Sequence, residues 1–220
     1  MPLPDGWVLT PYRAVVHAAT ATAVMADLHL GYAAQRQALG EAVPLWPEDA
    51  IRHRLQQIID QYRIRRLVIA GDMVERGLSG HNAATSFVHY CHKRSLEMIL
   101  VEGNHDQGLN ELKGVTRLTD SMMLNDVCIR HEIQDQKAGF TIVGHYHPVL
   151  RSGPNGRRIP CYLANEHVLI LPAQSEDASG INVLKQKSFS SFHCHAIVHG
   201  RVLDLGPLGQ LKKQLLNTHS

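Results

Sequence analysis

Gly103-Asn104-His105-Asp106 is the stretch of this chain with the clearest capacity for chemistry. The side-chain oxygen of Asn104 can bind a divalent metal ion among other oxygen and imidazole ligands. His105 can transfer a proton near neutral pH, and Asp106 follows closely enough to orient its imidazole. Gly103 permits a sharp turn after the apolar run at residues 98–101, which indicates a buried strand. We therefore expect metal-assisted acid–base chemistry at the end of this strand.

Three further clusters of the same residue types also follow apolar runs. They are Asp27 with His29, Asp72, and His145 with His147. Residues two apart in an extended backbone face the same way, so each pair can converge on one ligand. Carboxylate, imidazole and amide oxygen without thiolate suit Mn²⁺, Fe or Zn²⁺ better than Cu(I) or an iron–sulfur cluster. Six or seven such residues are too many for one four-coordinate ion but fit two ions that share a carboxylate.

The composition is that of an ordinary globular protein with an unusual number of histidines. Of 220 residues, 44% are hydrophobic and 19% charged, and the formal net charge of +2 neither requires nor excludes a nucleic-acid partner. The 15 histidines favour a metal or acid–base site. The four cysteines form no C-x-x-C pair, and no apolar run approaches membrane-spanning length. We therefore expect a cytoplasmic protein with no membrane partner.

The elements that position these clusters alternate between strands and helices in the first half. We expect strands at residues 12–17, 20–26, 67–70 and 98–101, with helices from about Pro47 and at about 82–94. Residues 32–46 have no clear periodicity and include Gly40 and Pro44, so we expect a long loop there. This alternation predicts parallel pairing in an α/β layered fold.

The second half predicts β-structure connected mostly by hairpins. Residues 121–124 and 127–130 flank Asn125-Asp126, a good two-residue hairpin turn, and His131 lies just beyond. Further strands are expected at residues 140–143, 161–165, 168–171, 192–199 and 201–204. Residues 208–220 form either a short polar helix or a disordered tail. Because no linker or repeat is visible, we expect one domain over residues 1–220.

The order of the motifs resembles that of the calcineurin-like metallophosphoesterase superfamily. That order, D-x-H, G-D, G-N-H-D, H and G-H-x-H, extends from Asp27 to His147. The resemblance implies an α/β sandwich of two mixed β-sheets flanked by helices. It implies one metal bound by Asp27, His29 and His147, a second bound by Asn104, His131 and His145, and Asp72 as the bridge. It also implies that His105 faces the leaving group, with Asp106 behind it.

Within the superfamily, the chain looks most like the bacterial phosphoesterases associated with a DNA ligase. The shared features are the stretch ending at residues 26–31, then Arg36, Gly40, Val43-Pro44 and Leu171-Pro172-Ala173. Two features differ. Residues 71–77, G-D-M-V-E-R-G, are more similar to the GDxVDRG stretch of Ser/Thr protein phosphatases, and Glu132 follows His131 where the superfamily usually has glycine. Arg36 and Arg76 are candidate phosphate-binding residues, the alternative being surface or salt-bridging arginines.

We therefore expect a dinuclear phosphoesterase that hydrolyses phosphodiester bonds in nucleic acids or nucleotides. In this expectation, a metal-bridging hydroxide attacks phosphorus in line and His105 protonates the leaving alkoxide. The cofactors would be two divalent metal ions, Mn²⁺ first, with Fe or Zn²⁺ as alternatives. The resemblance implies a DNA ligase/helicase system as partner and a role in DNA repair. The alternatives are a phosphomonoesterase acting on proteins or small molecules, and a non-catalytic scaffold of the same fold.

Overall fold

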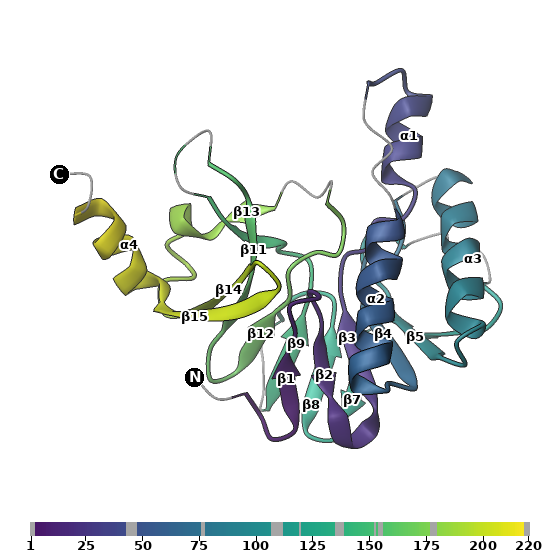
Figure 1. Ribbon diagram of the computed structural model, residues 1–220, viewed down its shortest axis with the longest axis horizontal. Helices are drawn as coiled ribbons and strands as arrows, with labels where there is room; N and C mark the ends of the chain where they lie inside the picture. The colour runs from purple at the N-terminus through teal and green to yellow at the C-terminus, as the bar shows by residue number, and fades with distance from the viewer. Residues whose placement is uncertain are drawn as a thin grey trace.

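Two mixed β-sheets form the centre of the protein, with helices outside them (Figure 1). This computed structural model describes residues 3–42, 48–75, 78–106, 112–118, 120–134, 139–151, 153, 156–176 and 180–217. In Figure 1 the helices α2 and α3 stand beside strands β4 and β5, whereas α4 lies at the opposite end of the molecule. The expected α/β class with two mixed sheets flanked by helices is confirmed.

The first sheet contains, within the described residues, six strands in the order β1-β2-β3-β4-β5-β6. Their bounds are Trp7–Leu9, Val15–His17, Thr22–Met25, Arg66–Ala70, Glu97–Val101 and Val115–Leu118. The pairs β1–β2 and β2–β3 are antiparallel, whereas β3 to β6 are parallel neighbours. The predicted alternation of parallel strands and helices is therefore confirmed for this half of the chain.

The second sheet contains nine of the described strands, and seven of them follow the order β13-β10-β11-β12-β9-β8-β7. Its strands in chain order are β7 Met122–Leu124, β8 Val127–Arg130, β9 Phe140–Val143, β10 Pro148–Leu150, β11 Ile159–Ala164, β12 Val168–Ile170, β13 Ile181–Asn182, β14 His193–Val198 and β15 Arg201–Pro207. Strand β14 pairs with both β11 and β15. The predicted hairpin at Asn125-Asp126 is confirmed, because β7 and β8 are antiparallel and Asn125 has a φ of 53°.

The helices differ from the prediction in one important place. Their bounds are α1 Tyr32–Ala38, α2 Glu48–Tyr62, α3 Leu78–His92 and α4 Leu208–Asn217, with short 3₁₀ turns η1 Ala18–Thr20 and η2 Val183–Lys185. The prediction of a loop over residues 32–46 is wrong at its start, where α1 forms. Ala33 is the buried side chain of α1, so this helix has no apolar stripe that a periodicity search could detect. Pro47 lies outside the described residues.

Each central strand of the first sheet is buried on both faces. In β4, Leu67 and Ile69 pack with α2 and α3, whereas Val68 and Ala70 pack against the second sheet. The same alternation divides β3 and β5 between these two cores. This explains why these strands read as continuous apolar runs without a polar face. A third core covers the outer face of the second sheet and includes Leu208 of α4.

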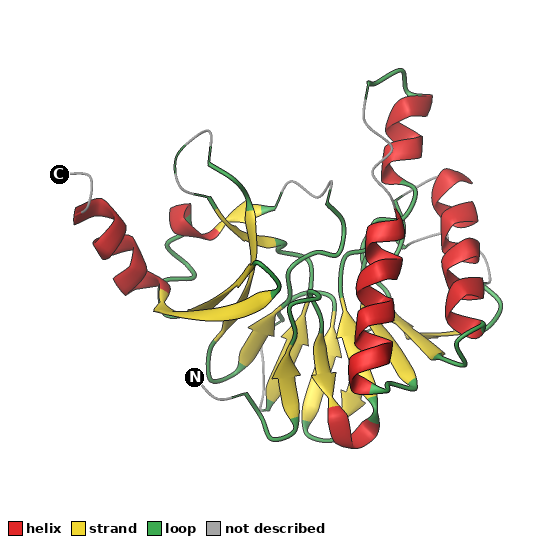
Figure 2. Cartoon of the chain, viewed as in Figure 1, coloured by secondary structure: helices red, strands yellow, loops and turns green. Residues whose placement is uncertain are grey.

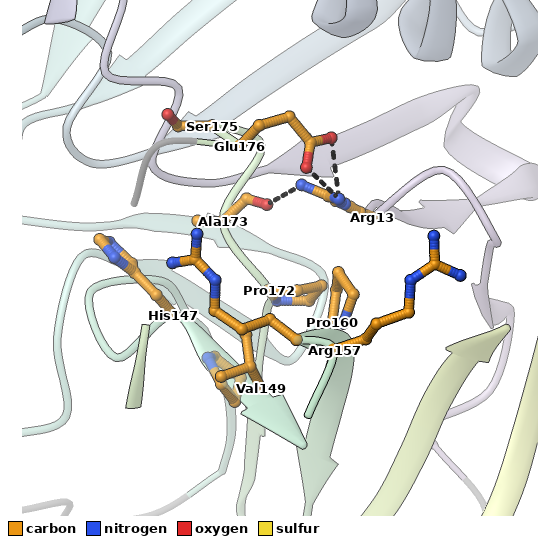
Figure 3. A pocket seen from close by; sticks show the side chains of 11 residues that line it. Arg13, His147, Val149, Arg157, Pro160, Pro172, Ala173, Ser175 and Glu176 are labelled. Carbon is orange, nitrogen blue, oxygen red and sulfur yellow. Dashed lines mark hydrogen bonds and ion pairs between the residues drawn. The ribbon is translucent and has the colours of Figure 1, made fainter. Parts of the chain in front are cut away.

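Loops gather along one edge of the sheets, toward which the arrowheads of the central strands point (Figure 2). Among them is the segment after β12. Gln174 is fully buried there and donates to the carbonyls of Tyr12 and Arg13, at 3.0 and 2.8 Å. Arg13 in turn donates to the carbonyl of Ala173 and to Glu176 (Figure 3). These bonds fix the segment against the first sheet.

No helix in the described part of the chain is both long and apolar enough to cross a membrane.

Tyr162 provides a test of how the two sheets are held together. Its side chain is completely buried in the core between the sheets, and its hydroxyl donates to the carbonyl of Thr10 at 2.6 Å. Tyr162→Phe should lower the free energy of unfolding by about 1–3 kcal/mol, because the buried carbonyl of Thr10 loses this donor. Tyr62→Phe is the control, since the half-buried Tyr62 hydroxyl bonds to no described residue. Equal denaturation midpoints for the two variants would contradict this role.

Candidate metal centre and active site

The predicted ligands lie in loops that follow five strands of two different sheets. The loops after β3 and β4 run side by side, because Asp27 N–H donates to the carbonyl of Gly71 at 3.1 Å and His29 N–H donates to that of Asp72 at 3.0 Å. The loops after β5, β8 and β9 supply the remaining ligands. The carboxyl ends of strands from both sheets therefore meet at one site, as expected for an α/β fold.

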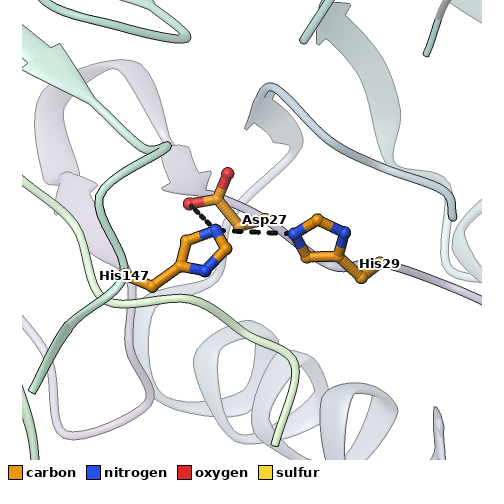
Figure 4. Close-up of side chains that lie close together, drawn as sticks. All are labelled: Asp27, His29 and His147. Carbon is orange, nitrogen blue, oxygen red and sulfur yellow. Dashed lines mark hydrogen bonds and ion pairs between the residues drawn. The ribbon is translucent and has the colours of Figure 1, made fainter. Parts of the chain in front are cut away.

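Asp27, His29 and His147 form the first ligand cluster, and Figure 4 shows their side chains pointing toward one another. His147 Nε2 lies 3.5 Å from Asp27 Oδ2 and 3.4 Å from His29 Nε2. Asp27 is fully buried and His147 is only partly exposed. The sequence placed these residues at two distant positions, and the structure brings them together.

Asp72, His131 and His145 form the second cluster, with Asn104 beside them. His131 Nε2 lies 3.5 Å from Asp72 Oδ2, 3.0 Å from His145 Nδ1 and 2.9 Å from the side-chain oxygen of Asn104. His131 is therefore at the centre of this cluster although Glu132 replaces the glycine that usually follows it. Burial and the charge of His131 lower the pKa of His145.

Asp72 connects the two clusters. Its Oδ2 lies 3.5 Å from His131 Nε2 and 4.0 Å from His29 Nε2, so one carboxylate oxygen faces a ring nitrogen from each cluster. Its Oδ1 accepts the backbone N–H of His105 at 2.9 Å. The carboxylate is thus fixed in orientation with one oxygen directed between the two clusters.

The chemistry of the donors fits divalent metal ions. Asp27 Oδ1 is buried and has no hydrogen-bond partner in the described part of the chain, which is costly unless a cation or proton satisfies it. Ring nitrogens of His131 and His145 lie 3.0 Å apart and those of His29 and His147 lie 3.4 Å apart, so each pair is close enough to bind one ion together. Carboxylate, imidazole and amide donors without thiolate suit Mn²⁺, Fe or Zn²⁺. The residues present therefore match the predicted cofactor class.

The backbone at this site is strained. Five of the seven predicted ligands have φ between 45° and 69°, a region that residues other than glycine rarely adopt: Asp27, His29, Asp72, His145 and His147. Such conformations cost roughly 1–3 kcal/mol each and persist only where the surrounding structure imposes them. The strain is concentrated where side chains must converge, which is typical of a functional site.

Glycines in the motifs are required by close packing against the ligands. A Cβ on Gly103 would overlap the Asp72 carboxylate, and a Cβ on Gly71 would overlap the His131 ring. A Cβ on Gly144 would lie 2.7 Å from Asp27 Oδ2. Each glycine therefore allows a loop from one strand to approach a ligand from another strand.

Glu75 is a residue of the site that the sequence reasoning did not select. Its Oε2 lies 3.3 Å from His29 Nδ1 and its Oε1 lies 3.0 Å from His105 Nδ1. Burial alone would raise the pKa of Glu75. The hydrogen bond to His29 and the charge of His105 together outweigh burial, so the pKa lies below its usual value. Burial lowers the pKa of His29, yet Glu75 and the aspartates raise it overall. The signal was present, because Glu75 is the second acidic residue of the G-D-M-V-E-R-G stretch, after Asp72.

Asp106 has a different environment from the one we expected. We expected its carboxylate to orient the His105 ring, but the carboxylate that contacts this ring is Glu75. Asp106 is fully buried, and its oxygens accept the backbone N–H groups of Gly103 and Val74 at 2.9 and 3.3 Å. Burial raises the pKa of Asp106 to about 6. Asp106 thus ties the loop after β5 to the loop after β4.

Of the two arginines selected from the sequence, Arg36 lies among the described residues, and its ion pair is with Glu41 rather than with a predicted ligand. Arg36 lies on α1, where it forms an ion pair with Glu41 and stacks over the Tyr32 ring at 5.6 Å. The hydrogen bond from Arg36 to Glu41 raises the pKa of the arginine. The other arginine, Arg76, lies outside the described residues.

Two cavities open beside the clusters. One, of about 270 Å³, is lined by His147 and by three arginines, Arg13, Arg157 and Arg158. The other, of about 330 Å³, is lined by Asn104, His131 and His145 from the second cluster. Each cluster therefore has its own access to solvent and to a ligand.

Glu75→Gln should weaken metal binding, although Glu75 is not one of the predicted ligands. The variant loses the carboxylate that holds the His29 ring, and such supporting residues typically contribute roughly 10–100-fold to metal affinity. Calorimetric titration with Mn²⁺ measures the loss. The control is Glu41→Gln, which removes an exposed carboxylate from the segment just after α1. Equal affinities in the two variants would exclude this role for Glu75.

Comparison with known proteins agrees with this geometry. The profile of the family described as calcineurin-like phosphoesterase matches residues 21–161, which include every predicted ligand. The chain is similar to the crystal structure of Pseudomonas putida nuclease MPE, with a TM-score of 0.75 and 23% identity over 90% of this chain and 94% of that one. No curated protein matches the sequence. The chain therefore belongs to the calcineurin-like phosphoesterase family.

Proposed function

We propose that this protein is a dinuclear metal-dependent phosphodiesterase. The observation that carries the proposal is the position of Asp72, one oxygen of which faces ring nitrogens from two separate ligand clusters. A carboxylate shared in this way is the expected bridge of a two-metal site, in which the ions lie about 3.5–4 Å apart. Such sites suit hydrolysis of phosphoric esters.

The roles of the ligands follow from the two clusters. We assign Asp27, His29 and His147 to one metal ion, and Asn104, His131 and His145 to the other, with Asp72 between them. When bound, the two ions would neutralise the phosphoryl oxygens and lower the pKa of the attacking water. Asp106 holds the loops after β4 and β5 in register, so we assign it a positioning role.

His105 is the residue we assign to the leaving group. Its Nδ1 contacts Glu75 at 3.0 Å, which leaves Nε2 as the nitrogen that can protonate an alkoxide. The side chain is about 29% exposed, so a substrate can reach it. Because Glu75 also contacts the predicted ligand His29, the proton donor and the metal site are held by one carboxylate. A positioned general acid typically contributes ~10²–10⁴ in rate.

The cavities support a diester over a monoester. A diester carries an organic group on each of two sides of phosphorus, and a cavity adjoins each ligand cluster. The similarity to a nuclease supports a nucleic acid or nucleotide as the substrate.

The four cysteines are free, and three of them are buried, which supports our inference of a reducing, cytoplasmic location. Mn²⁺ as the native metal and a DNA ligase/helicase partner stay predictions.

Metal analysis and hydrolysis together test the proposal. After loading with Mn²⁺, the wild-type protein should retain two ions per chain and hydrolyse bis(p-nitrophenyl) phosphate faster than p-nitrophenyl phosphate. Asp72→Asn should lose more metal and more activity than His147→Ala, because it removes the charge that would separate two cations at short range. One ion per wild-type chain, or a fully occupied and active Asp72→Asn variant, would contradict the bridging role. A faster monoester reaction would make the enzyme a phosphomonoesterase.

His105→Ala separates proton transfer from metal binding. The variant should keep both metal ions and lose about 10²-fold or more in rate on a diester with an alkyl leaving group. The loss should be much smaller with a nitrophenolate leaving group, which departs without protonation. Metal content and both rates are measured on one preparation. An equal loss on both substrates with the metals retained would indicate phosphate positioning, and a loss of metal would make His105 a ligand.

A further inference from the structure

The cavity beside His147 has features that the proposed phosphodiesterase reaction alone does not require. We call it the arginine pocket, because Arg13, Arg157 and Arg158 line it together with His147 and Glu176. Its volume of about 270 Å³ is slightly below the usual range for a complete small ligand. The pocket is therefore sized for one part of a larger substrate.

The arginine pocket carries net positive charge. Three arginines and one glutamate line it, which gives a formal charge of 3 − 1 = +2. Glu176 is already held by Arg13 at 2.9 Å and by Arg54, outside the pocket, at 2.8 Å. Arg157 and Arg158 are exposed and lie just before the start of β11. A phosphate is the natural ligand for such a group, since planar guanidinium groups can bind it bidentately.

Part of the pocket wall is apolar. Pro148, Pro160 and Pro172 contribute to it, together with Val149. The segment that carries Pro172 is fixed by the bonds of Arg13 to the carbonyls of Ala173 and Gln174, at 3.2 and 3.3 Å. Such a surface can contact a sugar or a base while the arginines bind a phosphate.

The pocket is directly continuous with the proposed reaction centre. His147 lines it, and the Nε2 of the same histidine lies 3.5 Å from Asp27 Oδ2 in the first ligand cluster. A phosphorus atom held at the clusters would therefore have the arginine pocket next to it. In a polynucleotide, the group next to the scissile phosphate is a nucleoside that carries another phosphate.

The second cavity has the opposite character. Glu102, Asp120 and Glu132 line it, with Arg130 as the cation among its lining residues, for a formal charge of 1 − 3 = −2. Arg117, outside the cavity, pairs with Glu102 at 2.6 Å, which still leaves two carboxylates against one arginine. A phosphate beyond the scissile one is therefore disfavoured on this side and favoured on the arginine side.

We propose that the arginine pocket binds the phosphate adjacent to the scissile phosphate of an oligonucleotide. This inference rests on the proposed phosphodiesterase function and narrows its substrate to nucleic-acid chains, with Arg157 and Arg158 as the residues that select them. A phosphate added at one end of a dinucleotide, and not at the other, occupies the pocket.

Dinucleotide substrates test the proposal. The wild-type enzyme should hydrolyse thymidylyl-thymidine with a kcat/KM that rises about 10–100-fold when a phosphate is added at the favoured end. In Arg157→Gln/Arg158→Gln, the ratio of kcat/KM for the phosphorylated over the unphosphorylated dinucleotide should fall toward one. The matched control is Arg63→Gln/Arg65→Gln, two exposed arginines before β4, at the end of the sheet away from the site. It should keep the wild-type ratio. A ratio of one in the wild type, or a wild-type ratio in Arg157→Gln/Arg158→Gln, would overturn the proposal.

Binding without catalysis makes the two proposals separable. Fluorescence anisotropy with labelled pentathymidylate in EDTA should show weaker binding by Arg157→Gln/Arg158→Gln than by the control, with a salt slope reduced by about 1 to 2. Equal affinities and slopes would exclude the pocket as a nucleic-acid site, whatever the activity. If the wild type hydrolyses neither dinucleotides nor bis(p-nitrophenyl) phosphate, the proposed function fails. The anisotropy measurement then tests by itself whether the arginine pocket binds nucleic acid.

Discussion

The concentration of buried lone pairs and negative charge at one edge of the two sheets is the constraint on which the rest of the site depends. Asp27 and Asp72 are buried there with Glu75 close by, and Asp27 Oδ1 accepts no hydrogen bond from the described residues. Such a group of side chains is unfavourable in a folded protein unless cations or protons neutralise it. Bound divalent metal ions would offset this repulsion, so the side chains that the fold buries together would bind metal strongly.

The packing between the sheets decides whether the ligands can meet. Asp27, Asp72 and Asn104 follow strands of the first sheet, whereas His131 and His145 follow strands of the second. The apolar core shared by the inner faces of the two sheets therefore holds the two halves of the site in position. Buried Tyr162, which donates a hydrogen bond across this core, is part of it. A rigid core also explains how the left-handed backbone of the ligand loops is maintained, because local strain persists only when the surroundings impose it.

The charged side chains around the clusters divide into groups with separate tasks. Glu75 contacts one predicted ligand and the proposed proton donor, so metal binding and proton transfer share one support. Glu176 is held by Arg13 and Arg54 and thereby fixes the segment after β12 beside the first cluster. The arrangement leaves one side of the reaction centre positively charged and the other negatively charged. A polyanionic substrate would therefore have a preferred orientation.

The sequence by itself predicted the strands and helices of the first half from apolar runs, which are local features, and the order of its motifs implied two mixed sheets by resemblance. The same motifs predicted the ligand residues and the class of metal that they would bind. The sequence did not reveal α1, a helix with no apolar stripe. Nor did it reveal the role of Glu75, whose partners His29 and His105 lie 46 and 30 positions away in the chain. Only the tertiary structure decided which carboxylate supports His105 and which arginines adjoin the site. These depend on loops from different strands meeting in space, and that proximity leaves no spacing in the chain.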